Sequence, residues 1–209
     1  MNNSIFNNRS SENNWLKFFY SSKLSKYPVR DVTNSQGQNH KTEPHIEVGA
    51  DNFLSQCNQK IIKSAVLNGS NYFFYFTNCK NRNLPFYNRK FIVGYLKILD
   101  KIEYNQIYCA LGKPYFVSYE EGIDIEKELG YSRTMRHKKI SQNDFEYILG
   151  RLSDGTNITE ILIDEISRLD EYNPIQYKTC LLLQNKDCFM KDYCIRYKKY
   201  LCDGKLTEK

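Results

Sequence analysis

Apolar and aromatic residues form short runs in the first two thirds of the chain and follow a helical period afterwards. Residues 71–77 read N-Y-F-F-Y-F-T, and residues 90–98 are β-branched and aromatic with an internal glycine. Runs of this length and composition, bounded by glycine and asparagine, are typical of β-strands. Residues 79–88 contain asparagine and proline and are expected to form the loop between these two strands.

Two shorter strands are expected downstream, at residues 106–110 and 114–118, around a turn at residues 111–113 that contains glycine. Gly94, inside the second of the longer strands, is expected to mark a β-bulge or a close backbone approach. Four strands with these interruptions predict a curved sheet or a small barrel.

Helices are expected after residue 140. Residues 141–144 (S-Q-N-D) have the S-x-x-D capping form, and apolar residues follow at helical spacing through Leu152. A second helix is expected to begin at residue 156 or 157, to carry apolar residues through Leu169 and to end before Pro174.

The first part of the chain is rich in asparagine and offers little apolar surface to offset the entropy of ordering, so an arm is expected there. Residues 15–20 (W-L-K-F-F-Y) interrupt it and are expected to form a short helix that anchors the arm to the body. The predicted organisation is a poorly ordered arm over residues 1–46, a body over 47–152 and a helical extension over 153–209.

Composition and charge set broad limits. The chain has 209 residues, 41% of them hydrophobic, which suffices for one domain of moderate size with a small appendage. A net charge of +6 favours an acidic partner without excluding an ordinary soluble enzyme. Residues 91–99, the longest apolar stretch, are too few for a membrane helix, and no secretion signal is apparent near the start. A cytoplasmic protein with no membrane partner is expected.

Four of the seven cysteines crowd the end of the chain as C-x7-C-x5-C-x7-C. Thiolates at such spacing can surround a tetrahedral ion, so a structural zinc site is predicted, with an iron–sulfur cluster as the less favoured alternative and unligated thiols as a third. The first two spacings resemble a CCCH-type zinc finger in which Lys198 stands at the histidine position, so a cysteine would complete the site. The expected metal ligands are Cys180, Cys188, Cys194 and Cys202.

Two basic segments favour nucleic acid. Residues 133–139 (R-T-M-R-H-K-K) contain no acid, and residues 195–200 (I-R-Y-K-K-Y) interleave cations with aromatics. A solvated loop or a charged edge strand is the alternative for the first segment. The residues expected to contact nucleic acid are Arg133, Arg136, His137, Lys138, Lys139, Arg196, Lys198 and Lys199.

The order of motifs resembles PUA-like domains of the EVE, ASCH and YTH kind over residues 47–152. The resemblance lies in a helix-like stretch at residues 56–65, the aromatic strand, the I-V-G-Y motif at residues 92–95 and a closing K-I-S-Q-N-D-F motif at residues 139–145. Residues 56–65 also resemble nucleotide-modification-associated domains of phage and prokaryotic DNA-modification neighbourhoods. This chain departs from the family in having Gly-Ser-Asn where Gly-Asp is usual, and its only tryptophan is Trp15.

The resemblance implies an α+β fold: a small PUA-like β-barrel with flanking helices, followed here by a C-terminal, metal-stapled helical tail. It also implies a pocket for a nucleobase beside a basic groove. Without a tryptophan cage, tyrosine and phenylalanine rings are expected to stack on the base, helped by nearby polar groups. The expected pocket residues are Ser55, Gln56, Asn58, Lys63, Tyr72, Phe74, Tyr95 and Tyr115.

The sequence therefore predicts a nucleic-acid-binding protein that reads a base, including a modified one, in DNA or RNA, and a role in phage defence or DNA modification fits. One alternative is a nuclease or base-modification enzyme that uses the same pocket, and another is a protein-interaction adaptor. Catalysis is less favoured and no catalytic residue is proposed, because the only histidines are His40, His45 and His137, two of them in the expected arm.

Overall fold

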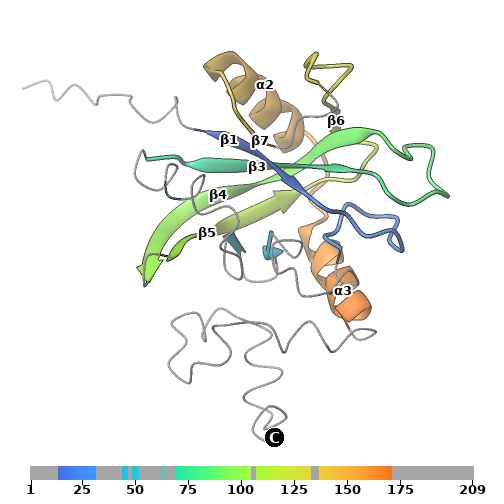
Figure 1. Cartoon of the computed structure of the whole chain (residues 1–209), viewed down its shortest axis with the longest axis horizontal. Coiled ribbons are helices and arrows are strands. Elements are labelled where there is room, and N and C mark those ends of the chain that lie inside the picture. Colours follow the sequence, from blue (N-terminus) through green and yellow to red (C-terminus); the bar gives the residue numbers. More distant parts are fainter. Residues whose placement is uncertain are drawn as a thin grey trace, which may run out of the picture.

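The aromatic runs pair into one mixed β-sheet of seven strands in the computed structural model of the chain (Figure 1). The structure describes residues 14–31, 44–46, 49–51, 63, 69–104, 107–132 and 137–170. The strands are β1 (Trp15–Phe19), β2 (Ala50–Asp51), β3 (Tyr72–Asn78), β4 (Lys90–Tyr104), β5 (Ile107–Phe116), β6 (Ile123–Asp124) and β7 (His137–Lys139), and the helices are α2 (Gln142–Ser153) and α3 (Thr159–Asp170).

The predicted α+β class is confirmed, but the sheet is not closed into a barrel. Its order is β2-β5-β4-β3-β1-β7, with β6 paired to β4 off this path. Among the described residues, the terminal strands of this order do not pair with each other. β2 spans two residues and β7 three, so each edge offers little backbone for a closing ladder.

The expected helix at residues 15–20 is wrong, because this segment is the parallel neighbour of β3. Trp15 pairs with Phe73, and the register runs on to Phe19 opposite Thr77. Leu16 lies in the core on one face of the sheet and Phe19 in the core on the other, which is the two-residue period of a strand. Residues 14–31 thus belong to the folded body, although they lie within the expected arm.

The two short strands expected around a glycine turn are one continuous strand, β5. Gly112 permits close packing within the sheet, since a Cβ atom there would lie 1.9 Å from the carbonyl oxygen of Lys97 on β4. The close approach expected at Gly94 is confirmed: a Cβ would lie 2.5 Å from the carbonyl oxygen of Tyr115, and the β3–β4 register shifts beside it.

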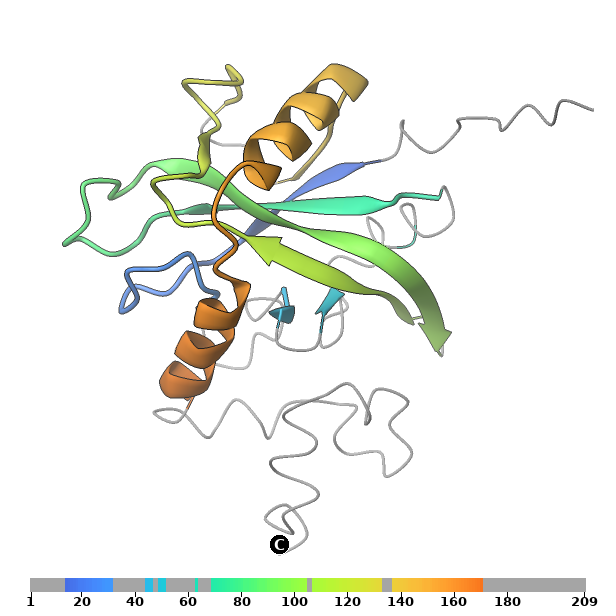
Figure 2. The same cartoon turned by 180° about the vertical axis from the view of Figure 1, so that it is seen from behind.

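The two predicted helices are confirmed and cover opposite faces of the sheet (Figures 1 and 2). α2 begins after the predicted cap, where the hydroxyl of Ser141 accepts a hydrogen bond from the backbone N–H of Asp144 at 3.2 Å. α3 packs into the same core as Phe73 and Tyr75 of β3. Residues 153–170, expected in a separate extension, therefore complete the core of the sheet.

No helix in the described part of the chain has both the length and the apolar character needed to span a bilayer.

Candidate functional site

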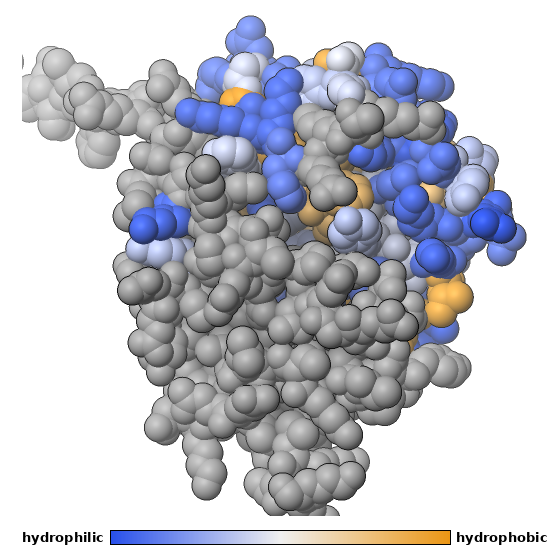
Figure 3. All heavy atoms as spheres, in the orientation of Figure 1, coloured by the Kyte–Doolittle hydropathy of each residue, from blue (hydrophilic) through white to orange (hydrophobic). Residues whose placement is uncertain are grey.

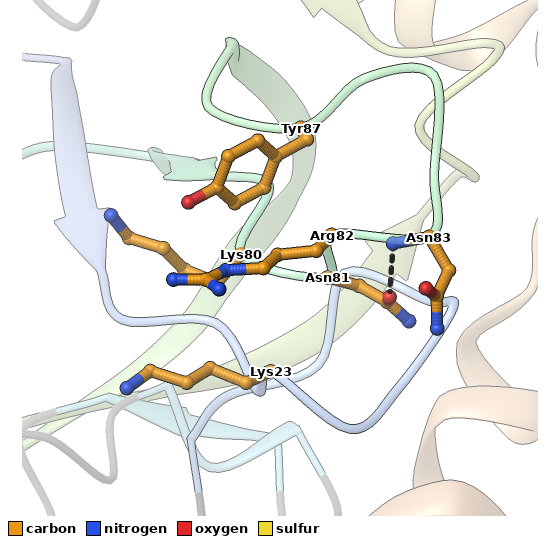
Figure 4. A pocket seen from close by; sticks show the side chains of 6 residues that line it. All are labelled: Lys23, Lys80, Asn81, Arg82, Asn83 and Tyr87. Atoms are coloured by element: carbon orange, nitrogen blue, oxygen red, sulfur yellow. Dashed lines mark hydrogen bonds between the residues drawn. The ribbon is translucent and has the colours of Figure 1, made fainter.

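Two loops lie side by side at the same end of the sheet, because β1 and β3 are neighbouring parallel strands and each loop follows one of them. Residues 20–31 follow β1 and residues 79–89 follow β3, so both loops emerge where these strands end (Figure 1). Figure 3, in the same view, shows hydrophilic side chains gathered over this side of the described surface. A pocket of about 440 Å³ lies between the loops (Figure 4). It is lined by Lys23, Lys80, Asn81, Arg82, Asn83 and Tyr87.

The loop at residues 79–89, which the sequence predicted over residues 79–88, is anchored by apolar side chains. Phe86 packs against Phe91 and Tyr119, with ring centroids 5.6 and 6.3 Å apart. At the loop base, the N–H of Asn88 donates to the carbonyl of Cys79 at 2.8 Å, and Asn88 adopts a left-handed φ of 64°. Asparagine tolerates this conformation better than most residues do. The loop therefore has a defined shape.

Asn81 joins the two loops. Its side-chain N–H₂ donates to the backbone carbonyl of Ser25 at 3.1 Å, and its side-chain oxygen accepts from the backbone N–H of Asn83 at 3.0 Å. The first loop is closed by its own backbone, where the N–H of Ser22 donates to the carbonyl of Val29 at 2.9 Å. The pocket walls are thus braced before any ligand arrives.

The pocket has a strongly positive lining. Lys23, Lys80 and Arg82 contribute three cations, and there is no carboxylate among the described residues that line it. Their cationic ends point to the same side of the loops, and the hydroxyl of Tyr87 is directed there as well (Figure 4). Uncompensated cations in a concave site attract anions, and phosphate is an anion that both lysine and arginine bind well.

The four aromatic residues expected at a base pocket come together, but on the face of the sheet that α2 covers. Tyr95 and Tyr115 stack with ring centroids 5.2 Å apart, and Tyr72 stacks on Phe74 at 5.9 Å. Phe74 is fully buried and contacts Phe145 of α2, so no base can reach its ring in this arrangement. Tyr72, Tyr95 and Tyr115 are half-buried.

The polar residues expected beside that pocket are not brought to these rings. Lys63 is exposed, with its Nζ 5.6 Å from the ring centroid of Tyr108, which belongs to the core on the opposite face. Ser55, Gln56 and Asn58 lie outside the described residues.

Three of the residues expected to contact nucleic acid form β7, an edge strand of the sheet. His137 accepts a hydrogen bond at Nδ1 from the backbone N–H of Phe18 at 3.2 Å, which ties its ring to β1. Lys138 places Nζ 3.3 Å from the ring centroid of Tyr131, and Lys139 is exposed. The charged edge strand considered for this segment is therefore present. Arg133, Arg136, Arg196, Lys198 and Lys199 lie outside the described residues.

The predicted metal ligands Cys180, Cys188, Cys194 and Cys202 also lie outside the described residues. Within the described ranges, no three His, Cys, Asp or Glu side chains come together as a metal site requires. Cys79 is buried at the base of the second loop, and burial raises the pKa of its thiol.

A buried ion pair lies on the face of the sheet that α3 covers. Lys17 of β1 pairs with Asp51 of β2, and the hydroxyl of Tyr75 donates to the same carboxylate at 2.6 Å. β5, β4 and β3 separate β2 from β1, a distance of about 19 Å in a flat sheet. The sheet therefore curls until side chains from its two sides meet.

Asp124 of β6 is another buried carboxylate with a structural role. It accepts hydrogen bonds from Nε of Arg89 at 3.0 Å and from the backbone N–H groups of Glu126 and Lys127 at 3.1 and 3.2 Å. Burial opposes its ionisation, but the bond to Arg89 and the two backbone bonds outweigh this and lower the pKa of Asp124.

Sequence reasoning missed the cationic pocket. The run Lys80-Asn81-Arg82-Asn83 was visible within a predicted loop, and two cations that alternate with two asparagines are a usable signal for anion binding. Lys23 could not have been assigned to the same site, because its place depends on the parallel pairing of β1 with β3.

Comparisons with protein-family models, with curated proteins and with solved structures find no match for this chain.

Proposed function

We propose that this protein binds nucleic acid and that the pocket between the two loops holds its phosphate groups. The observation that carries the proposal is the convergence of Lys23, Lys80 and Arg82 on one concave site whose described lining has no carboxylate. Phosphate contacts of this kind supply most of the sequence-independent affinity for nucleic acid. The two asparagines of the lining offer amide groups, one of them already used to brace the loops.

Aromatic rings at the end of β1, beside the two loops, favour a single-stranded ligand. Phe18 and Tyr20 at the end of β1 are half-buried, with ring centroids 5.0 Å apart, and Nζ of Lys90 lies 5.2 Å from the Phe18 ring centroid. Alternating cations and aromatic faces hold a strand by neutralising phosphates and stacking on bases. β7 pairs with β1, but Lys139 lies opposite Trp15 at the start of β1, away from Phe18 and the loops.

Base recognition, including that of a modified base, is the finer part of the proposal. The half-buried residues Tyr72, Tyr95 and Tyr115 are the described aromatic residues that support it, because each keeps part of its ring accessible although one face is stacked on a neighbour. A relationship to PUA-like domains remains a proposal on the sequence motifs, and it must accommodate an open sheet. The four cysteines of the tail are proposed to bind a structural zinc, which metal analysis would detect as about one zinc per chain.

The proposal is tested by fluorescence anisotropy with labelled single-stranded and duplex oligonucleotides of DNA and RNA. The variant Lys23→Ala/Lys80→Ala/Arg82→Ala removes the pocket cations, and Lys97→Ala/Lys113→Ala/Lys127→Ala removes three exposed cations elsewhere as a control of equal charge. We expect wild-type affinity to fall steeply between about 50 and 200 mM salt.

The pocket variant should lose about tenfold or more in affinity, and its salt dependence should flatten by about one unit of slope for each lost phosphate contact. The control variant should lose much less. Absence of binding by the wild-type protein, or an equal loss in both variants, would contradict the proposal.

A further inference from the structure

We infer that the pocket between the two loops receives the terminal phosphate monoester of a nucleic-acid strand, in preference to a phosphodiester within the strand. This inference rests on the proposed nucleic-acid function and names the part of the ligand that enters the site.

The first argument is the match of charge. A phosphodiester carries one negative charge, whereas a phosphate monoester carries about −1.5 to −2 at neutral pH and presents three terminal oxygens. Lys23, Lys80 and Arg82 direct three cations from two loops to one place (Figure 4). Such a cluster exceeds the charge of a single diester, and a second diester of the same strand would have to bend into the same pocket.

The second argument is the shape of the site. A strand that binds along its length needs a groove open at both ends, and single-strand-binding surfaces track several nucleotides. Here the lining residues come from two loops that Asn81 ties together, and they line a solvent-open pocket of about 440 Å³. That volume falls within the range of small-molecule pockets, so it suits one terminal nucleotide.

The third argument is an aromatic ring beside the cations. Tyr87 is 44% exposed, although its loop is anchored by the neighbouring Phe86. The backbone N–H of Tyr87 donates to the carbonyl of Leu84 at 3.1 Å, which fixes the turn that presents the ring. The ring lies on the same side of the loops as the ends of Lys80 and Arg82 (Figure 4). A terminal base can stack there while its phosphate contacts the cations.

Asn81 has a positioning role in this arrangement, because its amide group is engaged by Ser25 and Asn83. Its replacement leaves every pocket charge in place and loosens only the connection between the loops. Asn81→Ala should therefore reduce the preference for a phosphorylated end while affecting the salt dependence of binding little.

The test uses the full chain and single-stranded oligonucleotides of one sequence with three kinds of end: a 5′-phosphate, a 3′-phosphate, or hydroxyls at both ends. We expect one of the phosphorylated strands to bind about tenfold more tightly than the hydroxyl-ended strand. Lys80→Ala/Arg82→Ala and Tyr87→Ala should each reduce this ratio, whereas Lys97→Ala/Lys113→Ala should preserve it. A thermal melt of each variant confirms that it is folded.

The outcomes separate the two proposals. Equal affinity for all three strands would overturn the terminal-phosphate inference and leave nucleic-acid binding intact. Failure to bind any strand would overturn the proposed function as well. A nucleoside monophosphate distinguishes a strand end from a free nucleotide as the ligand. If the protein binds the monophosphate but binds none of the oligonucleotides, both proposals are overturned.

Discussion

Lys17 lies in β1, and the pocket cations lie in the loops that follow β1 and its parallel neighbour β3. The charge of Lys17 is paired with a carboxylate, whereas the pocket cations have none in their described lining. Lys17 is buried inside the curled sheet, where Asp51 neutralises it and Tyr75 donates to the same carboxylate. Lys23 and Arg82 are exposed a few residues beyond the ends of β1 and β3, in a lining whose described residues include no carboxylate. One region compensates its charge and the other concentrates it.

The difference separates a contribution to stability from a capacity to bind. A buried charge is tolerated only with a partner, because its desolvation is costly, and removing one partner leaves the other uncompensated. Like charges held together at a surface repel one another and so lower the stability of the fold slightly. The same charges contribute favourable free energy when an anion binds between them. Substitutions in the two regions should therefore have opposite signatures in stability and in binding.

The largest effect is expected for Lys17→Met, which leaves the carboxylate of Asp51 buried without its cation. The free energy of unfolding should fall by about 3–5 kcal/mol, measured by urea denaturation. The triple variant Lys17→Met/Asp51→Leu/Tyr75→Phe should recover most of this loss, because it also removes the hydroxyl that donates to Asp51 and leaves an apolar cluster that needs no compensation. A single variant that costs less than about 1 kcal/mol would show that Lys17 is not held as described.

A smaller loss is expected for Asp124→Asn, whose ion pair with Arg89 is partly exposed. The cost at neutral pH should be about 1.5–3 kcal/mol. Since the pKa of Asp124 is lowered in the folded state, its contribution is complete above the ordinary carboxyl value of 3.8 and is lost as pH falls through the lowered value.

Denaturation curves from pH 7 to about pH 3 should therefore show the wild-type protein and Asp124→Asn converging below about pH 4. Asp164→Asn, which removes an exposed carboxylate on α3, is the control and should change stability little. A gap that widens in acid would contradict the assignment of Asp124.

Tyr75→Phe tests the hydroxyl that completes the buried network. It removes one donor from Asp51 and keeps Lys17 in place, so a loss of about 0.5–1.5 kcal/mol is expected in urea denaturation. Tyr147→Phe is the matched control, because its hydroxyl donates to Glu128 at 2.8 Å in an exposed position. Equal losses in the two variants would remove the distinction between the buried and exposed hydroxyls.

The smallest change in stability is expected for Lys80→Ala in the pocket. The free energy of unfolding should stay within about 0.5 kcal/mol of wild type, with any change toward greater stability at low salt, where repulsion between pocket cations is least screened. Oligonucleotide affinity should fall in the same protein. A loss of stability comparable to that of Lys17→Met would mean that Lys80 is a structural residue.

The elements that could be predicted from the sequence are those whose structure depends on residues close together in the chain. β3, β4, the loop between them and the capped start of α2 follow from local composition and spacing, and the structure confirms each. β1 was missed because W-L-K-F-F-Y is compatible with a short amphipathic helix, and its partner strand lies more than fifty residues away. The continuous strand β5 was missed because Gly112 resembles a turn residue, whereas its actual role is a close contact with Lys97.

The candidate site shows the same division. The structure places Tyr72, Phe74, Tyr95 and Tyr115 on one face of the sheet, since side chains alternate between faces along a strand. Their burial beneath α2 depends on where that helix packs, which no local pattern specifies. The pocket was missed because its cations come from two loops that are distant in sequence, and only the parallel register brings them together.

The position of β1 also has a consequence for the order in which the chain assembles. β3, β4 and β5 form from neighbouring segments, whereas the contact between Phe19 and Thr77 spans 58 residues and that between Phe18 and His137 spans 119. Long-range pairings form slowly because they require closure of large loops. We expect β1 to dock late, during or after synthesis of the rest of the sheet, and pulsed hydrogen exchange would show its amides protected after those of β4. The cationic pocket would then exist only in molecules that have finished folding.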